Sequence, residues 1–108
     1  ILSNGIISKY TSINNNTSLK NNIQIDQFVN IGENCIINSG SIVSHDSNIG
    51  NHSHIAPGAV LGGHVEIKSN VVIGMGATIF LSVKIGENTI INNGMNIFSD
   101  INAGQIIS

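Results

Sequence analysis

The sequence predicts an all-β domain wound as a parallel β-helix, in which short strands form coils that stack along one axis. Three observations predict this fold. An aliphatic residue recurs at every sixth position from Ile1, and a residue that tolerates a left-handed backbone usually follows three positions later. Large aromatic residues are scarce, with no Trp and only 4% aromatic residues in total. This composition therefore favours a core of regularly stacked aliphatic side chains.

The aliphatic position keeps its phase along the chain. Counted in sixes from Ile1, the first position of each hexad is Ile, Leu or Val everywhere except at Ala103. The 108 residues divide into 18 hexads (108/6), and we expect the phase to hold through all of them. Strands of a β-sandwich are unevenly spaced and have no reason to keep one phase.

The remaining positions of the hexad predict one strand and one turn. The fifth position is mostly small or β-branched, as at Cys35, Ser41 and Ala59, and the second is often Gly, as at Gly32 and Gly104. We expect positions five, six, one and two to alternate inward and outward as in a strand. Position four is mostly Gly, Asn or Asp. Because these residues adopt positive φ readily, positions three and four should turn a corner.

Three such strands should close one triangular coil. Three hexads bring the chain back to the same face, so residues three hexads apart should stack in columns, about 4.8 Å apart from coil to coil. The whole chain then makes about six three-strand coils. The periodicity alone does not fix the handedness of the helix, and the usual crossover rule would favour the right hand.

Two of the three expected faces point apolar side chains outward. The face centred on Ile13 should be solvated, because its outward positions are largely polar or Gly. The faces centred on Ile37 and Val43 carry outward aliphatic and aromatic residues, which indicates burial against a partner. These are Ile36, Val72 and Ile90 on one face and Ile42, Val60, Phe80 and Phe98 on the other.

The corner between the two apolar faces stacks glycines at position four, which permit a close approach of backbones. These are Gly40, Gly58, Gly76 and Gly94. We infer a homotrimer with this corner near the three-fold axis. A cleft would then lie between the Val43 face of one subunit and the Ile37 face of its neighbour.

His45 and Asp46 are the strongest candidates for catalysis. They occupy a corner at the edge of the Val43 face, and the adjacent carboxylate would fix the tautomer of the imidazole as a general base. One coil later the same column holds Gly63, whose N–H is a candidate oxyanion donor. A solvated corner histidine followed by a turn aspartate explains the pair about as well.

The other histidines have simpler interpretations. His54 takes an outward strand position on the Ile37 face, where it would either line the neighbour's cleft or pack within the interface. His52 and His64 hold position four, where His tolerates positive φ, so we interpret both as turn residues.

The repeat resembles that of the hexapeptide-repeat acyltransferases, in which an aliphatic residue, often followed by Gly, is combined with a small residue at the fifth place. The segment 37–63 includes Ser-His-Asp, Ser-His-Ile-Ala-Pro-Gly and Gly-Gly. It resembles more narrowly the sialic acid O-acetyltransferase and nucleotide-amino-sugar N-acetyltransferase family. The resemblance implies a left-handed helix, a homotrimer and acetyl-CoA-dependent transfer of an acetyl group to an amine or hydroxyl of a sugar.

The resemblance also implies roles for individual residues. His45 would be the catalytic base and Asp46 the residue that polarises it, while Asn38 would lie near the substrate. His54, Gly62 and Gly63 would lie on the acetyl-CoA side, and no metal is expected. Members of this family usually carry an N-terminal α/β domain that this sequence does not contain. We therefore interpret residues 1–108 as the repeat domain of a longer chain.

Two other functions fit the same fold. A γ-carbonic-anhydrase-type zinc enzyme needs three histidines per site, and its family spacing includes a pair five residues apart, which this sequence lacks. A non-catalytic structural or trimerisation β-helix is the other alternative. The net charge of −2 gives no indication of a nucleic-acid or anionic-membrane partner. The single cysteine, Cys35, fits a cytoplasmic protein.

Overall fold

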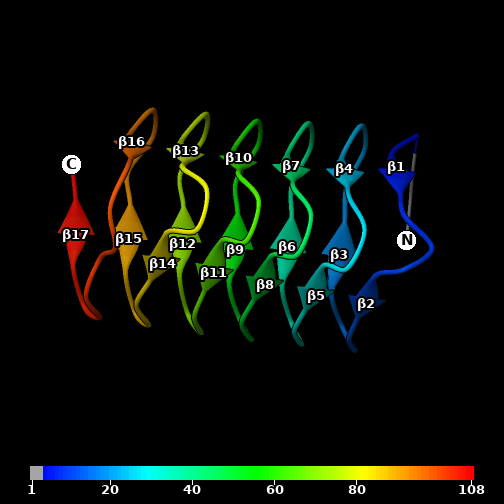
Figure 1. The fold of residues 1–108 in the computed structure, drawn as a ribbon, viewed down its shortest axis with the longest axis horizontal. Coiled ribbons are helices and arrows are strands. Elements are labelled where there is room, and N and C mark those ends of the chain that lie inside the picture. Colours follow the sequence, from blue (N-terminus) through cyan, green and yellow to red (C-terminus); the bar gives the residue numbers. More distant parts are fainter. Residues whose placement is uncertain (1–3) are drawn as a thin grey trace.

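The computed structural model describes residues 4–108 and confirms the all-β parallel β-helix. Figure 1 shows the coils standing side by side along the long axis, with the two ends of the chain at opposite ends of the stack. The winding is consistent with the left-handed helix that the resemblance implies. All strands are two residues long, and no helix that could span a membrane occurs among the described residues.

The strands form three parallel sheets, one for each face of the helix. The first sheet contains β1 (Ile6–Ile7), β4 (Gln24–Ile25), β7 (Ile42–Val43), β10 (Val60–Leu61), β13 (Thr78–Ile79) and β16 (Asn96–Ile97). The second contains β2 (Ser12–Ile13), β5 (Asn30–Ile31), β8 (Asn48–Ile49), β11 (Glu66–Ile67) and β14 (Lys84–Ile85). The third contains β3 (Ser18–Leu19), β6 (Ile36–Ile37), β9 (His54–Ile55), β12 (Val72–Ile73), β15 (Ile90–Ile91) and β17 (Ile106–Ile107).

Strand pairing confirms the columns predicted from the repeat. Ile37 pairs with Ile55, and Ile55 pairs with Ile73, so side chains three hexads apart lie directly above one another. Backbone hydrogen bonds join the coils at each strand. For example, the Ile36 N–H donates to the Ser53 carbonyl at 3.1 Å.

Position one and position five form the core. Ile37, Ile55 and Ile73 are fully buried, and the fifth-position side chains fill the space between their columns. Burying one aliphatic side chain of this size contributes about 1.5–3 kcal/mol. The inward and outward alternation expected of the hexad is therefore confirmed.

The fifth position also explains why hydroxyls are found in this core. The Ser47 Oγ donates to the Gly62 carbonyl at 3.0 Å and accepts the Val65 N–H at 3.1 Å. Ser53 makes the same two bonds one hexad later, to the Lys68 carbonyl and from the Val71 N–H. Each hydroxyl thus links two coils, and no buried side-chain N or O in residues 4–108 lacks a partner. A buried hydroxyl with both functions satisfied is not destabilising.

Position four is left-handed at each corner from Asn16 to Gly94, as the sequence predicted, but not at Tyr10 or Asp100. The φ angles lie near +60° for Asn and Asp, and even Phe28 and Ser82 adopt φ of 61° and 62°. The turn N–H donates back to the preceding coil, as Gly58 does to the Ser39 carbonyl at 2.9 Å. Between Asn16 and Gly94 the stacked backbone therefore imposes this conformation even on residues that rarely adopt it.

The last coil corrects the prediction of an unbroken phase. Ile85 bridges to Ile101 and Ile91 pairs with Ile107, so both steps span 16 residues instead of 18. Two residues are missing from the repeat between Ile97 and Ile101. Gly104 therefore holds position four, with φ of 77°, and not the second position that the simple count gave it. Ala103 broke the aliphatic pattern in the simple count because it lies after this shift.

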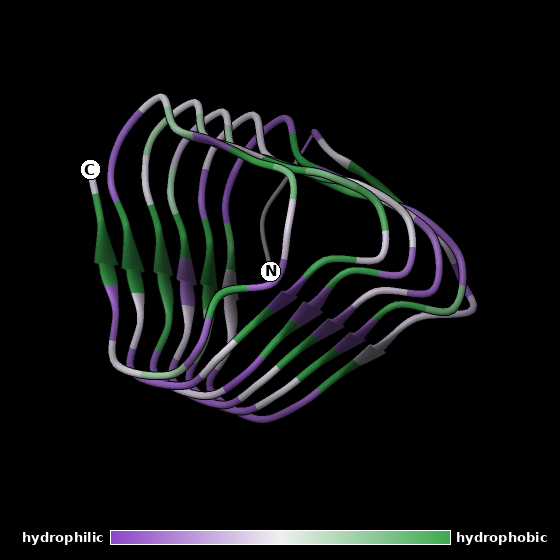
Figure 2. Ribbon diagram, turned by 60° about the vertical axis from the view of Figure 1, so that its left-hand side comes forward, coloured by the Kyte–Doolittle hydropathy of each residue, from purple (hydrophilic) through white to green (hydrophobic). Residues whose placement is uncertain are grey.

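The three faces differ in polarity as the sequence predicted. Figure 2 shows most strands of the second sheet as hydrophilic and most strands of the third as hydrophobic. The exceptions in the third sheet are β9, which carries His54, and β3, which carries Ser18. On the third sheet Ile36, Val72 and Ile90 point outward and are 36–40% exposed. On the first sheet the ring centroids of Phe80 and Phe98 lie 5.5 Å apart, and both rings are exposed.

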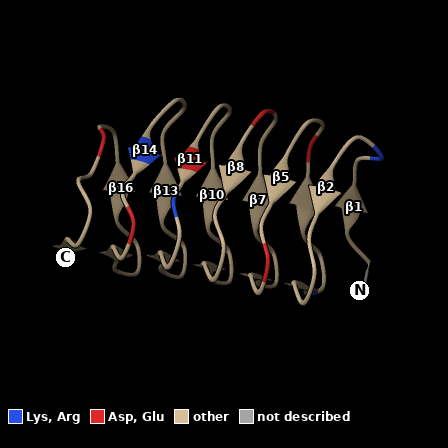
Figure 3. Cartoon of the chain, turned by 90° about the horizontal axis from the view of Figure 1, so that it is seen from below, with Lys and Arg blue, Asp and Glu red and all other residues tan. Residues whose placement is uncertain are grey.

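Charged side chains are few, and those in strands lie on the second sheet. Figure 3 shows the positively charged strand β14 beside the negatively charged strand β11, where Lys84 pairs in register with Glu66. The hydrogen bond from Lys68 lowers the pKa of Glu66 from its ordinary value, and the charges of Lys68 and Lys84 act in the same direction. This face is the solvated one.

We expect Ile55→Ala to lower the free energy of unfolding by about 2–5 kcal/mol, because it leaves a cavity in the middle of a fully buried column. Urea denaturation followed by circular dichroism measures the loss. Ile6→Ala is the matched control, since Ile6 is 71% exposed and should lose far less. An equal loss in the two variants would contradict the columnar core.

Candidate active site

The corner between the first and second sheets brings together two consecutive turns. The turn that follows β7 presents His45 and Asp46, and the turn that follows β10 presents Gly63 and His64. Asp46 and His64 hold position four, with φ of 61° and 58°. The His64 N–H donates to the His45 carbonyl at 2.9 Å, which fixes one turn above the other.

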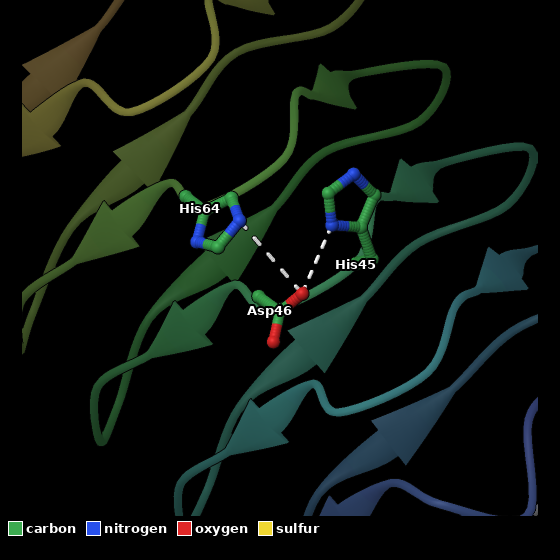
Figure 4. Close-up of side chains that lie close together, drawn as sticks. All are labelled: His45, Asp46 and His64. Carbon is green, nitrogen blue, oxygen red and sulfur yellow. Dashed lines mark hydrogen bonds and ion pairs between the residues drawn. The ribbon is translucent and has the colours of Figure 1, made fainter.

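The two residues predicted to act together form a hydrogen bond in the structure, and their catalytic roles stay predictions. His45 Nδ1 lies 3.0 Å from Asp46 Oδ2 (Figure 4). An ionised carboxylate can only accept a hydrogen bond, so the shared hydrogen belongs to Nδ1. The neutral imidazole then carries its lone pair on Nε2, which is the form that can accept a proton.

Gly63 lies against the other nitrogen of the same ring. A Cβ at this position would be 2.7 Å from His45 Nε2 and 2.8 Å from Cε1, so any side chain would displace the imidazole. The Gly63 N–H has no hydrogen-bond partner among the described residues. The structure therefore places Gly63 beside the nitrogen that can accept a proton, and its role as an oxyanion donor stays a prediction.

His64 joins this cluster, which the sequence interpretation did not anticipate. Its Nε2 lies 3.8 Å from Asp46 Oδ2, and its ring meets the His45 ring edge-on at a centroid distance of 5.3 Å. The interpretation of His64 as a turn residue is correct for its backbone. The missed signal was the column itself, because Asp46 and His64 are 18 residues apart and so stack directly.

Gly62 differs from its neighbour in how its backbone is used. Its N–H donates to the Ile79 carbonyl at 2.9 Å, and its carbonyl accepts the Ser47 hydroxyl. Both groups are therefore occupied within the helix. Its predicted role toward acetyl-CoA stays a prediction.

Asn38 and His54 lie together on the third sheet, away from this corner. Asn38 Nδ2 and His54 Nε2 are 3.3 Å apart, and Asn38 Oδ1 accepts the Ser39 N–H at 2.8 Å. A single chain thus does not bring these two residues to His45. Their predicted substrate and cofactor roles require the facing surface of a second subunit and stay predictions.

The cluster is open to solvent. The side chains of His45, Asp46 and His64 are 56%, 42% and 60% exposed, and the described residues form no pocket around them. His52 lies at a different corner, in the predicted turn with φ of 62°, where its Nδ1 is 3.3 Å from Asn34 Nδ2. The site is a surface edge that a partner can cover.

Comparison with known families identifies the repeat. Residues 46–80 match the family described as bacterial transferase hexapeptide (six repeats). The match covers about a third of the chain and agrees with the resemblance to the hexapeptide-repeat acyltransferases; its residues include Asp46, His54, Gly62, Gly63 and His64. No curated protein sequence matches the chain.

Solved structures share the fold. GDP-perosamine N-acetyl transferase from Caulobacter crescentus, a mutant crystallised with CoA and GDP-perosamine, is 25% identical with a TM-score of 0.78, over 93% of this chain and 50% of that one. Serine acetyltransferase isoform 3 from Entamoeba histolytica is 29% identical with a TM-score of 0.76, over 80% of this chain and 34% of that one. A maltose O-acetyltransferase from Clostridium difficile 630, 22% identical, has a TM-score of 0.83 over 91% and 65%. The chain spans half or less of the first two proteins.

We expect Asp46→Asn to abolish the tautomer preference of His45, because an amide can both donate and accept while a carboxylate only accepts. Asn suits the turn, since Asn70 holds the same position with φ of 57°. Long-range ¹H–¹⁵N NMR of the imidazoles reports the tautomer. The His52 signals should not change, and an unaltered Nδ1–H form of His45 would show that Asp46 does not fix the ring.

Proposed function

We propose that this hexapeptide-repeat chain is the catalytic domain of an acetyl-CoA-dependent acetyltransferase that modifies an amino or hydroxyl group of a sugar. The observation that carries the proposal is the His45–Asp46 hydrogen bond beside Gly63, with the acceptor nitrogen of the ring turned to a glycine turn. This arrangement supplies a general base and a nearby backbone donor. Both accelerate acyl transfer.

The reaction follows from these groups. His45 Nε2 accepts the proton of the sugar amine or hydroxyl as that group attacks the thioester carbonyl carbon. Negative charge develops on the carbonyl oxygen, and the Gly63 N–H donates a hydrogen bond to it. The C–S bond then breaks, and the CoA thiolate takes the proton that His45 has accepted. Asp46 holds Nδ1–H throughout and stabilises the transient imidazolium.

The solved neighbours support both partners of the reaction. The Caulobacter protein was crystallised with CoA and a nucleotide-linked amino sugar. The Entamoeba protein is named a serine acetyltransferase, and serine is not a sugar. The fold thus serves more than one acceptor class, and the sugar assignment rests on the narrower resemblance of the segment 37–63.

We also propose that the active form is a homotrimer. The first and third sheets carry outward apolar residues on either side of a corner that stacks Gly40, Gly58 and Gly76. Packing these sheets of neighbouring subunits together would remove that surface from water. It would also place Asn38 and His54 of one subunit opposite the His45 corner of the next.

We expect His45→Ala to lower turnover by roughly 10²–10⁴-fold, because general-base catalysis contributes about that factor. Release of the CoA thiol measures turnover, with GDP-perosamine and serine among the acceptors tested. His52→Asn is the control, since His52 lies at another corner. Turnover by His45→Ala at the normal rate would reject its role as base. Absence of acetyl-CoA binding in calorimetry would reject the function itself.

We expect Val72→Glu to shift the protein from trimer toward monomer, because it places a charge in the middle of the outward apolar column of the third sheet. Sedimentation equilibrium measures the mass. Asn48→Glu, an outward position on the solvated second sheet, should leave the mass unchanged. A trimer that survives Val72→Glu, or a wild-type monomer, would contradict the assembly.

A further inference from the structure

We propose that His45, Asp46 and His64 form a binding site for a divalent transition-metal ion such as Zn²⁺. One ligand atom from each of the three side chains lies within 4.8 Å of the other two. Figure 4 shows His45 Nδ1 and His64 Nε2 both turned toward Asp46 Oδ2, at 3.0 and 3.8 Å. Among the described residues, no other group of three His, Cys, Asp or Glu side chains lies this close together.

The distances suit tetrahedral coordination. Bonds of about 2.0–2.1 Å at the tetrahedral angle separate two ligand atoms by about 3.4 Å. The separations of 3.0 and 3.8 Å from Asp46 Oδ2 lie on either side of that value, and the two histidine nitrogens lie within 4.8 Å of each other, so rotation of the exposed side chains is needed to close the site. Two imidazoles and a carboxylate are a donor set that Zn²⁺ and its neighbours accept, and water would complete the coordination.

The fold brings the backbones of the three ligands together before any ion arrives. Asp46 and His64 stack in one column, and the backbone bond from His64 N–H to the His45 carbonyl ties the two turns together at 2.9 Å. Within residues 4–108, the ion-pair partners of Asp46 are these two histidines, so no Lys side chain competes for its charge. Only side-chain rotation is needed to bind, which keeps the entropy cost low.

The remaining histidines offer no equivalent arrangement. His52 is paired with Asn34 and His54 with Asn38, in both cases through an amide nitrogen at 3.3 Å. Neither ring has a carboxylate beside it in the described part of the chain. The site is therefore specific to the corner between the first and second sheets.

A metal ion bound at this site would prevent His45 from acting as a general base. This consequence rests on the proposed function. A neutral imidazole bound to metal through Nδ1 carries its hydrogen on Nε2. Nε2 then has no lone pair with which to accept the proton of the acceptor. The ion would act as a reversible inhibitor of acetyl transfer and not as a cofactor.

Zinc titration of the chelator-treated protein by isothermal calorimetry tests the site. We expect saturable binding of one Zn²⁺ per chain and an affinity at least roughly tenfold weaker in His64→Asn. Asn suits that turn, because Asn70 and Asn88 adopt φ of 57° and 58° at the same hexad position. His52→Asn is the matched control at another corner and should bind Zn²⁺ as the wild type does.

Three results would overturn the site: no saturable binding, unchanged binding by His64→Asn, or an equal loss in His52→Asn. Circular dichroism confirms that both variants fold. In the turnover assay, Zn²⁺ should inhibit the wild type over the concentration range of the calorimetric titration, and His64→Asn should need at least tenfold more. If the wild-type protein shows no saturable zinc binding, the metal site is overturned even if the protein transfers acetyl groups. Saturable binding that depends on His64 supports the site even if no acetyl transfer is found.

Discussion

Parallel pairing between successive coils is the interaction on which the rest of this structure depends. A single coil of short strands has no core of its own, because its inward side chains need the coil above and below to bury them. Backbone hydrogen bonds such as Ile36 N–H to the Ser53 carbonyl set the spacing, and columns such as Ile37, Ile55 and Ile73 fill the interior. The corners within the stack, from Asn16 to Gly94, then adopt a left-handed conformation even where the residue is unsuited to it, which is why Phe28 adopts φ of 61°.

The sequence predicted most of this fold because one physical requirement is repeated in every hexad. Inward residues must be aliphatic or small, and corner residues must tolerate positive φ. The residue pattern of the hexad therefore predicts the β-helix. The shortened last coil was missed because a strict count in sixes still found Ile97 in phase, and only Ala103 disagreed. Pairing of Ile91 with Ile107 is a property of the assembled coils, which the count could not reveal.

The candidate site was predictable where the residues are adjacent in the chain. His45 and Asp46 are neighbours, and Gly63 follows from the column of His45. His64 was missed because its turn position explained it fully, although its column partner is Asp46. The relation of Asn38 and His54 to the site depends on how subunits pack, which the repeat of a single chain does not encode.

The shortened last coil also shows which changes in length this architecture accepts. Two residues are lost between Ile97 and Ile101, and Ile101 and Ile107 still point into the helix and remain partly buried. Because inward and outward side chains alternate along a strand, an even loss keeps every later residue on its proper side, whereas an odd one would expose the core. The last coil therefore shows that a corner can lose two residues without turning the later inward side chains out of the core.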